Sequence, residues 1–226
     1  MKAYWYLTRA SGAVSLILLT VAVVIGILSI GRVQSDRWPR FVIDGVHRSS
    51  SLLAVAFLAI HVVTAVLDSF APISLLDSLV PFVGSYRPLW LGLGAVAMDL
   101  LLAVTITSLL RHRLGHRLWR VVHWLAYATW PIAVVHSLGT GSDVRLVWLQ
   151  LTCAVCGAAV VAAVLARIAI GWPAHRRIRI GALGALTAAL VTVALWLPQG
   201  PFGHDWAKRA GTPTNLLPAS ERGAGS

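Results

Sequence analysis

The chain has 226 residues, of which 58% are hydrophobic and 12% are charged, and its mean hydropathy is +0.77. A soluble domain of this size cannot bury so much apolar surface, so the composition excludes an ordinary water-soluble protein. The formal net charge of +11 would suit a nucleic-acid-binding protein. The basic residues are clustered between long uncharged stretches, however, and ordinary membrane topology explains that pattern without a nucleic acid.

Six largely uncharged stretches follow one another, each close to or above the roughly 20 residues that cross a bilayer as a helix. They cover residues 10–31, 49–67, 88–110, 121–142, 146–166 and 180–203. Backbone groups in lipid must be satisfied internally, and none of the stretches alternates as a barrel strand does. We therefore predict an all-α fold, a polytopic six-transmembrane-helix bundle. The first stretch is longer than the ~7–15 residues of a signal-peptide core, so it is interpreted as a retained helix.

The sequence divides into a membrane domain, residues 1–197, and a tail, residues 198–226, that is rich in Gly, Pro, Ala and Ser. We expect the tail to be extracytoplasmic and partly disordered. Three connections, after the first, third and fifth stretches, hold 12 of the 19 Lys and Arg residues. The positive-inside rule places these connections in the cytoplasm. Both termini are then predicted outside the cytoplasm, in a multi-pass protein of the plasma membrane.

Four histidines lie in the second and fourth apolar segments as two pairs, His47 with His61 and His123 with His136. A single histidine in an apolar segment is more commonly a hydrogen-bonded core residue, but four are costly in lipid and predict a site. Imidazole is a common axial ligand of haem iron. Separations of 14 and 13 residues correspond to about 21 and 20 Å along a helix. Each pair therefore has one ring near each face of the membrane.

The second and fourth helices run parallel, because one full crossing separates them, so rings at equal depth are expected to share a haem. His47 and His123 would hold the iron of an inner haem, and His61 and His136 that of an outer haem. Fourteen residues at about 100° each return to within about 40° of the start, but thirteen leave the two rings about 140° apart. Pro131 lies between them, and we predict a distortion near Trp130–Pro131 that turns His136 toward the haem.

The two segments read DGVHRSSSLLAVAFLAIHVVTAV over residues 44–66 and RLWRVVHWLAYATWPIAVVHSLGTGSD over residues 117–143. With them the chain resembles the ferric reductase-like transmembrane domain, over roughly residues 10–167. This family includes ferric reductases, NADPH oxidases and the haem subunit of the bacterial methionine sulfoxide reductase system. The resemblance implies two b-type haems per chain, each held by two histidines, one from each of two parallel helices. All four ligand positions are filled.

Three further residues are candidate haem contacts. Arg48 and Arg120 adjoin the inner ligands and could pair with haem propionates, although positive-inside placement explains them equally well. Trp124 lies deep enough in the fourth segment to contact a haem.

Asp99 and a Cys-x-x-Cys pair interrupt the apolar segments. Asp99 is the middle residue of the third stretch, where we expect it to be protonated or hydrogen-bonded, with a proton path as the alternative. Cys153 and Cys156 lie among Ala and Gly and are interpreted as helix-packing residues rather than a redox pair.

These observations predict transmembrane electron transfer through two stacked haems, from a cytoplasmic reductant to an acceptor on the outer side. No flavin or nicotinamide motif is recognisable, so the chain is expected to be an oxidoreductase component that receives electrons from a separate donor, a flavoprotein. Its other expected partner is membrane lipid. Two alternatives stay open: a single-haem, quinone-reactive membrane anchor of a larger oxidoreductase, and a haem-free transporter or structural membrane protein.

Overall fold

The computed structural model describes residues 2–29, 39–140, 144–170 and 172–217, and every regular element in these ranges is helical. The long helices are α1 (Lys2–Ser29), α2 (Arg40–Leu67), α4 (Pro88–Leu109), α7 (Ala126–Thr140), α8 (Val147–Ala169) and α9 (Arg176–Gln199). The short ones are α3 (Leu75–Leu79), α5 (Arg111–Leu114), α6 (His116–His123), α10 (Trp206–Arg209) and the 3₁₀ turn η1 (Thr214–Leu216). The predicted all-α fold is confirmed.

Six spans in the described ranges are long and apolar enough to cross a membrane, as predicted, and the chain is a multi-pass membrane protein. The fourth span consists of α6 and α7 together. Four spans begin earlier than the uncharged stretches do, at Ala3, Arg40, His116 and Arg176. Arginine is a good helix former and its long side chain reaches the membrane surface, so a helix continues past the point where hydropathy falls.

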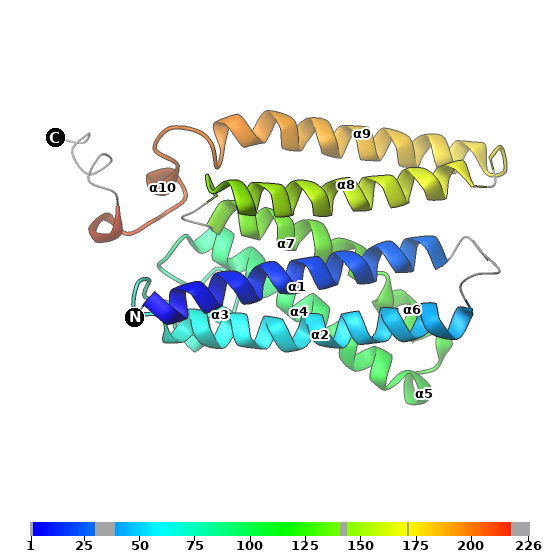
Figure 1. The fold of residues 1–226 in the computed structure, drawn as a ribbon, viewed down its shortest axis with the longest axis horizontal. Coiled ribbons are helices and arrows are strands. Elements are labelled where there is room, and N and C mark those ends of the chain that lie inside the picture. The colour runs from blue at the N-terminus through cyan, green and yellow to red at the C-terminus, as the bar shows by residue number, and fades with distance from the viewer. Residues whose placement is uncertain (1, 30–38, 141–143, 171, 218–226) are drawn as a thin grey trace.

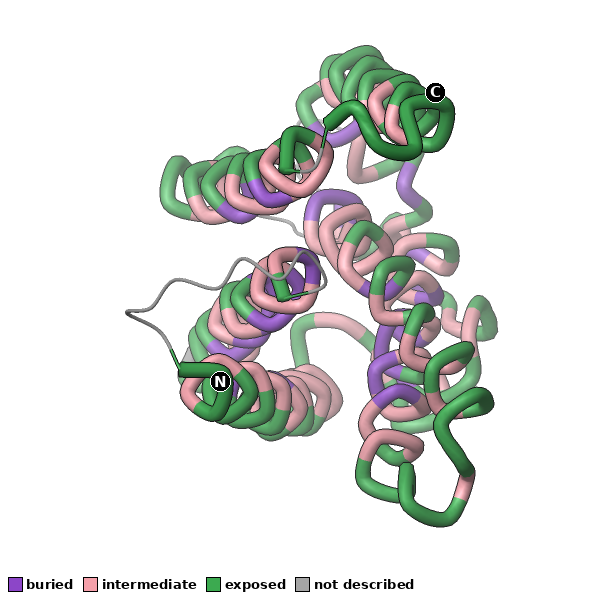
Figure 2. The backbone as a smooth tube through the Cα atoms, turned by 90° about the vertical axis from the view of Figure 1, so that its right-hand side faces the viewer, coloured by how far each residue is buried: buried purple, intermediate pink, exposed green. Residues whose placement is uncertain are grey.

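The spans form two packed pairs with two further helices on one side (Figure 1). α1 packs along α2, and α4 packs along α7. α8 lies against α1, and α9 contacts the bundle through α8. Buried positions face the inside of the bundle, whereas nearly all of α9 is exposed (Figure 2). The two pairs, α1 with α2 and α4 with α7, therefore enclose the interior in which a site can form.

Successive spans alternate in direction, so α2 and α7 run the same way (Figure 1). The start of α1 and the short helix α10 lie at one end of the bundle, and α5 and α6 lie at the other. The arginine-rich helix ends gather at the α5–α6 end, where α2 and α9 also begin.

Hydroxyl groups form hydrogen bonds between α1 and α2. Thr8 Oγ1 donates to Thr64 Oγ1 at 2.9 Å between α1 and α2. Ser15 Oγ, also on α1, donates to the carbonyl oxygen of Ala54 at 3.0 Å. Interhelical hydrogen bonds of this kind contribute about 0.6 kcal/mol each on average in a membrane bundle. They fix the register of α1 against α2, on which the site described below depends.

The fourth span is distorted at Trp124–Leu125, between α6 and α7, and not at Trp130–Pro131 as predicted. The Leu125 amide donates to the carbonyl of Val122 at 3.0 Å, and the Tyr127 amide to that of Trp124 at 3.1 Å. These i→i−3 bonds replace the α-helical pattern, while Pro131 lies inside α7. The proline removes the amide donor for the Tyr127 carbonyl, so it weakens the helical turn that precedes Pro131 in the chain.

The described part of the predicted tail is ordered. Residues 200–217 turn back over the end of the bundle and include α10 and η1. The rest of that predicted tail, residues 218–226, lies outside the described residues.

Candidate functional site

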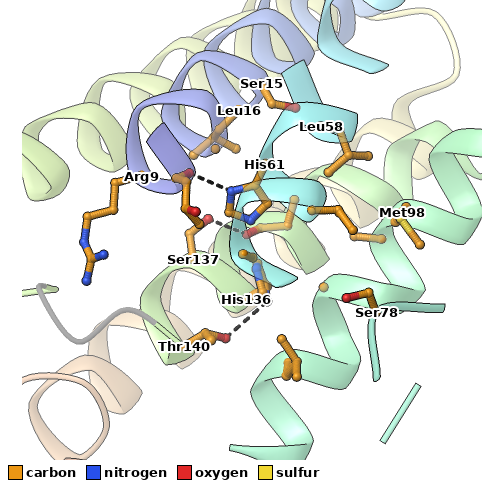
Figure 3. Close-up of a pocket in the computed structure, with 18 of the residues that line it drawn as sticks. Arg9, Ser15, Leu16, Leu58, His61, Ser78, Met98, His136, Ser137 and Thr140 are labelled. Carbon is orange, nitrogen blue, oxygen red and sulfur yellow. Dashed lines mark hydrogen bonds between the residues drawn. The ribbon is translucent and has the colours of Figure 1, made fainter. Parts of the chain in front are cut away.

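His61 on α2 and His136 on α7 face each other across the interior of the bundle (Figure 3). Their ring centroids are 6.4 Å apart and the rings are nearly perpendicular, at 87°. A cavity of about 260 Å³ adjoins both rings. α1, α2, α4 and α7 all contribute to its lining, with Leu16, Leu58 and Met98 among the apolar side chains. The outer pair therefore lies at a largely apolar cavity, to which α3 and α8 also contribute Ser78, Trp148 and Leu149.

His47 and His123 form the second pair, at the arginine-rich end. Their ring centroids are 6.2 Å apart, with an interplanar angle of 64°. The structure thus places His47 next to His123 and His61 next to His136. This follows from the parallel direction of α2 and α7, since the pairs would cross if the helices were antiparallel.

Both centroid separations suit two imidazoles that bind one metal ion from opposite sides. An imidazole nitrogen binds a transition metal at about 2 Å, so with the ring radii included the two centroids lie about 6 Å apart. No cluster of three or more His, Cys, Asp or Glu side chains that could hold an ion occurs in the described ranges. A porphyrin supplies its own four nitrogens, however, and needs only the two axial ligands that each pair presents.

Backbone carbonyls hold three of the four rings through Nδ1. His61 Nδ1 lies 2.7 Å from the Thr8 oxygen, and His47 Nδ1 lies 3.0 Å from the Ala22 oxygen. His136 Nδ1 lies 2.8 Å from the Trp90 oxygen. A carbonyl oxygen only accepts, so Nδ1 carries the proton in each ring and the lone pair is on Nε2. This is the arrangement of metal-binding histidines, whose second nitrogen donates to a carbonyl or carboxylate.

Each of these acceptor carbonyls is followed four residues later by a glycine. The acceptors and their glycines are Thr8 and Gly12, Ala22 and Gly26, and Trp90 and Gly94. In a helix the Cα–Cβ bond points toward the N-terminus, so the side chain of residue i+4 covers the carbonyl of residue i. Glycine at i+4 leaves that carbonyl open to an imidazole that comes from another helix.

The close approach is evident from the space beside these glycines. A Cβ on Gly94 would lie 2.5 Å from His136 Cε1 and Nδ1, and one on Gly12 would lie 2.8 Å from His61 Nδ1. A Cβ on Gly26 would lie 3.8 Å from His47 Cε1, an ordinary contact. The outer pair is therefore held more tightly than the inner pair.

His123 is held differently. Its Nδ1 lies 3.5 Å from Ser108 Oγ, which also accepts a hydrogen bond from Trp119 Nε1 at 3.2 Å. Ser108 lies 14 residues after Gly94 on α4, the same spacing that separates Gly12 from Gly26 on α1. A serine thus occupies the fourth glycine position, and its hydroxyl replaces the carbonyl as the partner of Nδ1. The ideal helix phase points His136 away from the predicted site, but in the structure His123 is the least constrained of the four rings.

Trp119 is a residue of the site that the sequence analysis does not predict. Its ring stacks on His123 with centroids 5.0 Å apart and an angle of 28°. The signal was available, because residues four apart share a helix face.

The other predicted haem contacts lie at the surface. Arg48 is exposed, and Arg120 is exposed with its Nη2 donating to His116 Nε2 at 2.6 Å. Trp124 lies in the break between α6 and α7, 66% exposed, with its ring against Tyr127. The structure brings none of these three side chains between the histidine pairs, and their contact with a haem stays a prediction.

Asp99 is exposed on α4, pointing out of the bundle. No hydrogen bond joins it to a Ser or Thr in the described part of the chain, in contrast to the partner expected from the sequence.

Cys153 and Cys156 are buried free thiols on α8. They pack with Leu16, Leu138 and Val144 in one apolar cluster. We expect Cys153→Ala with Cys156→Ala to leave the visible spectrum and the electron-transfer rate unchanged, with thermal stability lowered by the loss of packing, since neither thiol lies at the histidine pairs. Stopped-flow reduction and a melting curve of the purified variant check this. A rate that falls while the melting temperature holds would show a redox role.

Comparison with known proteins agrees with this geometry. The family described as "Ferric reductase like transmembrane component" matches residues 9–134, more than half of the chain. The matched region contains His47, His61 and His123 and ends two residues before His136. No curated protein and no solved structure is significantly similar to the chain. The family generally binds haem and is associated with electron transfer across membranes. The protein belongs to the ferric reductase-like transmembrane component family.

Proposed function

We propose that the protein carries electrons across the plasma membrane through two b-type haems, an inner one on His47 and His123 and an outer one on His61 and His136. The observation that supports this most directly is the pair of ring separations, 6.2 and 6.4 Å, in rings of which three are bound to the backbone through Nδ1 and not Nε2. Bound haem would supply a one-electron iron couple at each site.

The residues of the chain have three roles in this proposal. The four imidazoles would hold the two haems, two rings to each, which would favour electron transfer over the binding of oxygen or another ligand at iron. The carbonyls of Thr8, Ala22 and Trp90 fix the orientation of the rings, keep the proton on Nδ1 and raise the basicity of Nε2. The apolar lining of the outer cavity, including Leu16, Leu58 and Met98, excludes water.

The direction of transfer follows from the charge distribution. The arginine-rich end, with His47 and His123, would face the cytoplasm, and both termini would lie outside it. Electrons would enter at the inner site from a separate donor, a flavoprotein, and leave at the outer site to an acceptor outside. The chain would thus be one component of an oxidoreductase.

Haem quantitation on the full chain tests the proposal. We expect protein purified in detergent from haem-replete cells to contain two b haems per chain, with a bis-histidine reduced-minus-oxidised spectrum. In proteoliposomes loaded with ferricyanide, external dithionite should reduce the enclosed ferricyanide. Colourless protein, or liposomes in which the ferricyanide survives as it does without protein, would contradict the proposal.

A single-haem membrane anchor is the second candidate. The observation in its favour is that the cavity is lined by His61 and His136, whereas His47 and His123 are not part of its lining. One haem per chain in the same quantitation would support this candidate over the first.

A further inference from the structure

The segment that follows α9 lies beyond the region that matches the family, yet it contacts Arg87 and Trp90, which lie next to the residues that hold His136. Residues 200–217 pack over the end of the bundle where α4 begins and α7 ends. Two sets of contacts join this segment to the residues that hold His136.

Arg87 makes the first set. Its side chain is 3% exposed. Its Nε donates to Thr212 Oγ1 at 2.9 Å, and its backbone amide donates to the Gly211 carbonyl at 3.0 Å. Its Nη1 donates to the carbonyls of Gly139 and Thr140, both at 3.1 Å. The guanidinium therefore caps the C-terminal end of α7 while it binds the returning segment, a favourable place for a cation.

Three tryptophans make the second set. The Trp90 ring on α4 stacks on Trp196 of α9, with centroids 5.4 Å apart and an angle of 28°. Trp206 of α10 lies on the same ring, with centroids 5.0 Å apart. Trp90 also covers Gly139, where a Cβ would overlap its indole. Trp206 Nε1 is buried and donates no hydrogen bond to a described residue, so the contacts of this ring are made by its faces and edges, including the Arg209 guanidinium 5.7 Å from its centroid.

Both sets converge on one nitrogen. His136 Nδ1 lies 2.8 Å from the carbonyl oxygen of Trp90 and 3.2 Å from Thr140 Oγ1. Trp90 is the residue that the tryptophan cluster fixes, and Thr140 is one of the two residues that Arg87 caps. A shift of the returning segment would therefore change the hydrogen bonds of this ring and leave those of His47 and His123 in place.

We propose that residues 200–217 act as a positioning clamp for the outer haem, with Trp206 and Thr212 setting the Nδ1 hydrogen bonds of His136 through Trp90 and Arg87. The inference rests on the proposed function, because it concerns a haem on His61 and His136. Trp206 and Thr212 are positioning residues, since neither touches the histidine ring.

Two matched pairs of variants in the full chain test the clamp. We expect Trp206→Ala to transfer its outer haem to apomyoglobin roughly tenfold faster than the wild type, the lower end of the range for groups that orient metal ligands. Trp206→Phe should behave as the wild type, because the indole nitrogen has no hydrogen-bond partner among the described residues. Thr212→Val should resemble Trp206→Ala, whereas Thr212→Ser retains the acceptor for Arg87.

Redox titration provides the second measurement. A weaker Nδ1 hydrogen bond makes the imidazole a poorer donor to ferric iron, so the midpoint potential of the outer haem should rise in Trp206→Ala. If haem affinity falls tenfold in the ferric state and is unchanged in the ferrous state, the midpoint potential rises by about 59 mV for the one-electron couple. The spectrum of His136→Ala, which retains the inner haem, assigns the two transitions.

Leu195→Ala is the control for general loosening, because Leu195 adjoins Trp196 on α9 but is 64% exposed. The clamp would be overturned if Trp206→Ala left the outer haem unchanged or affected both haems equally. It would also be overturned if Leu195→Ala had as large an effect on the outer haem. If Trp206→Ala does not fold, the Thr212 pair decides. Protein without haem would refute the proposed function itself, which distinguishes the two failures.

Discussion

Replacing His61 or His136 with alanine is expected to lower the haem content from two per chain to one. The outer haem would be held by both rings, and the ring that remains cannot move to compensate, because His61 is bound to α1 and His136 to α4. The remaining haem should be the inner one, with the spectrum of a bis-histidine site. Pyridine haemochrome quantitation and a redox titration of each purified variant check this.

His47→Ala should give the reciprocal result and leave the outer haem. His112→Ala is the control, since His112 is exposed on α5 and lies outside both histidine pairs and the segment after α9. Two haems retained in His61→Ala, or equal losses in His112→Ala, would rule out the assignment of the outer ligands.

Gly94→Ala is expected to be nearly as damaging as loss of the ligand itself. The added Cβ would lie 2.5 Å from two atoms of His136, and neither the α4 backbone nor the half-buried ring can move away without breaking the hydrogen bond to Trp90. Overpacking of this kind costs about 1–3 kcal/mol, which corresponds to a roughly 5- to 150-fold weaker hold on the outer haem. The rate of haem transfer to apomyoglobin measures it.

Other glycines of the chain provide a graded series for this experiment. Gly12→Ala should have a similar effect through His61, whereas Gly26→Ala should be mild, because the Cβ would be 3.8 Å from His47. Gly184→Ala, with open space around it on α9, should change nothing. Equal effects at all four positions would show that helix propensity matters here rather than contact with the imidazoles.

The pairing of the histidines could be predicted because it depends only on spacing and direction. Residue counts give the depth of each ring, and the number of crossings gives the direction of α2 and α7. The position of the helix distortion could not be found in this way. Pro131 marks the helix that is weakened, but the break occurs at Trp124–Leu125, between α6 and α7. The proline leaves the Tyr127 carbonyl without its amide donor, but it does not specify which of the preceding turns is distorted.

The distortion also accounts for the phase of His136. A 3₁₀ turn advances about 120° per residue instead of about 100°, so each residue in this geometry adds about 20°. The i→i−3 bonds near Leu125 therefore reduce the 140° offset expected between His123 and His136 on an ideal helix. The same result was anticipated from Pro131, although the correction takes place one to two turns earlier.

The partners of Nδ1 could not be predicted from side-chain patterns, because three of them are backbone carbonyls that any residue provides. The glycines at i+4 are visible in the sequence, but a glycine in an apolar helix indicates helix packing equally well. Only the contact with an imidazole shows what these glycines do. Ser108 carries even less signal, since it is one of several hydroxyl residues on α4.

The hydrogen bonds between α1 and α2 impose a counting rule on the chain. Thr8 pairs with His61 and Ala22 with His47, so each carbonyl and its histidine have residue numbers that add up to 69. An insertion of a single residue between these two carbonyls would rotate one of them by about 100° away from its ring. The apolar residues in between are free to exchange with one another, but their number is not free to change. Homologues of this chain should therefore tolerate substitutions in the middle of α1 far better than a change in its length.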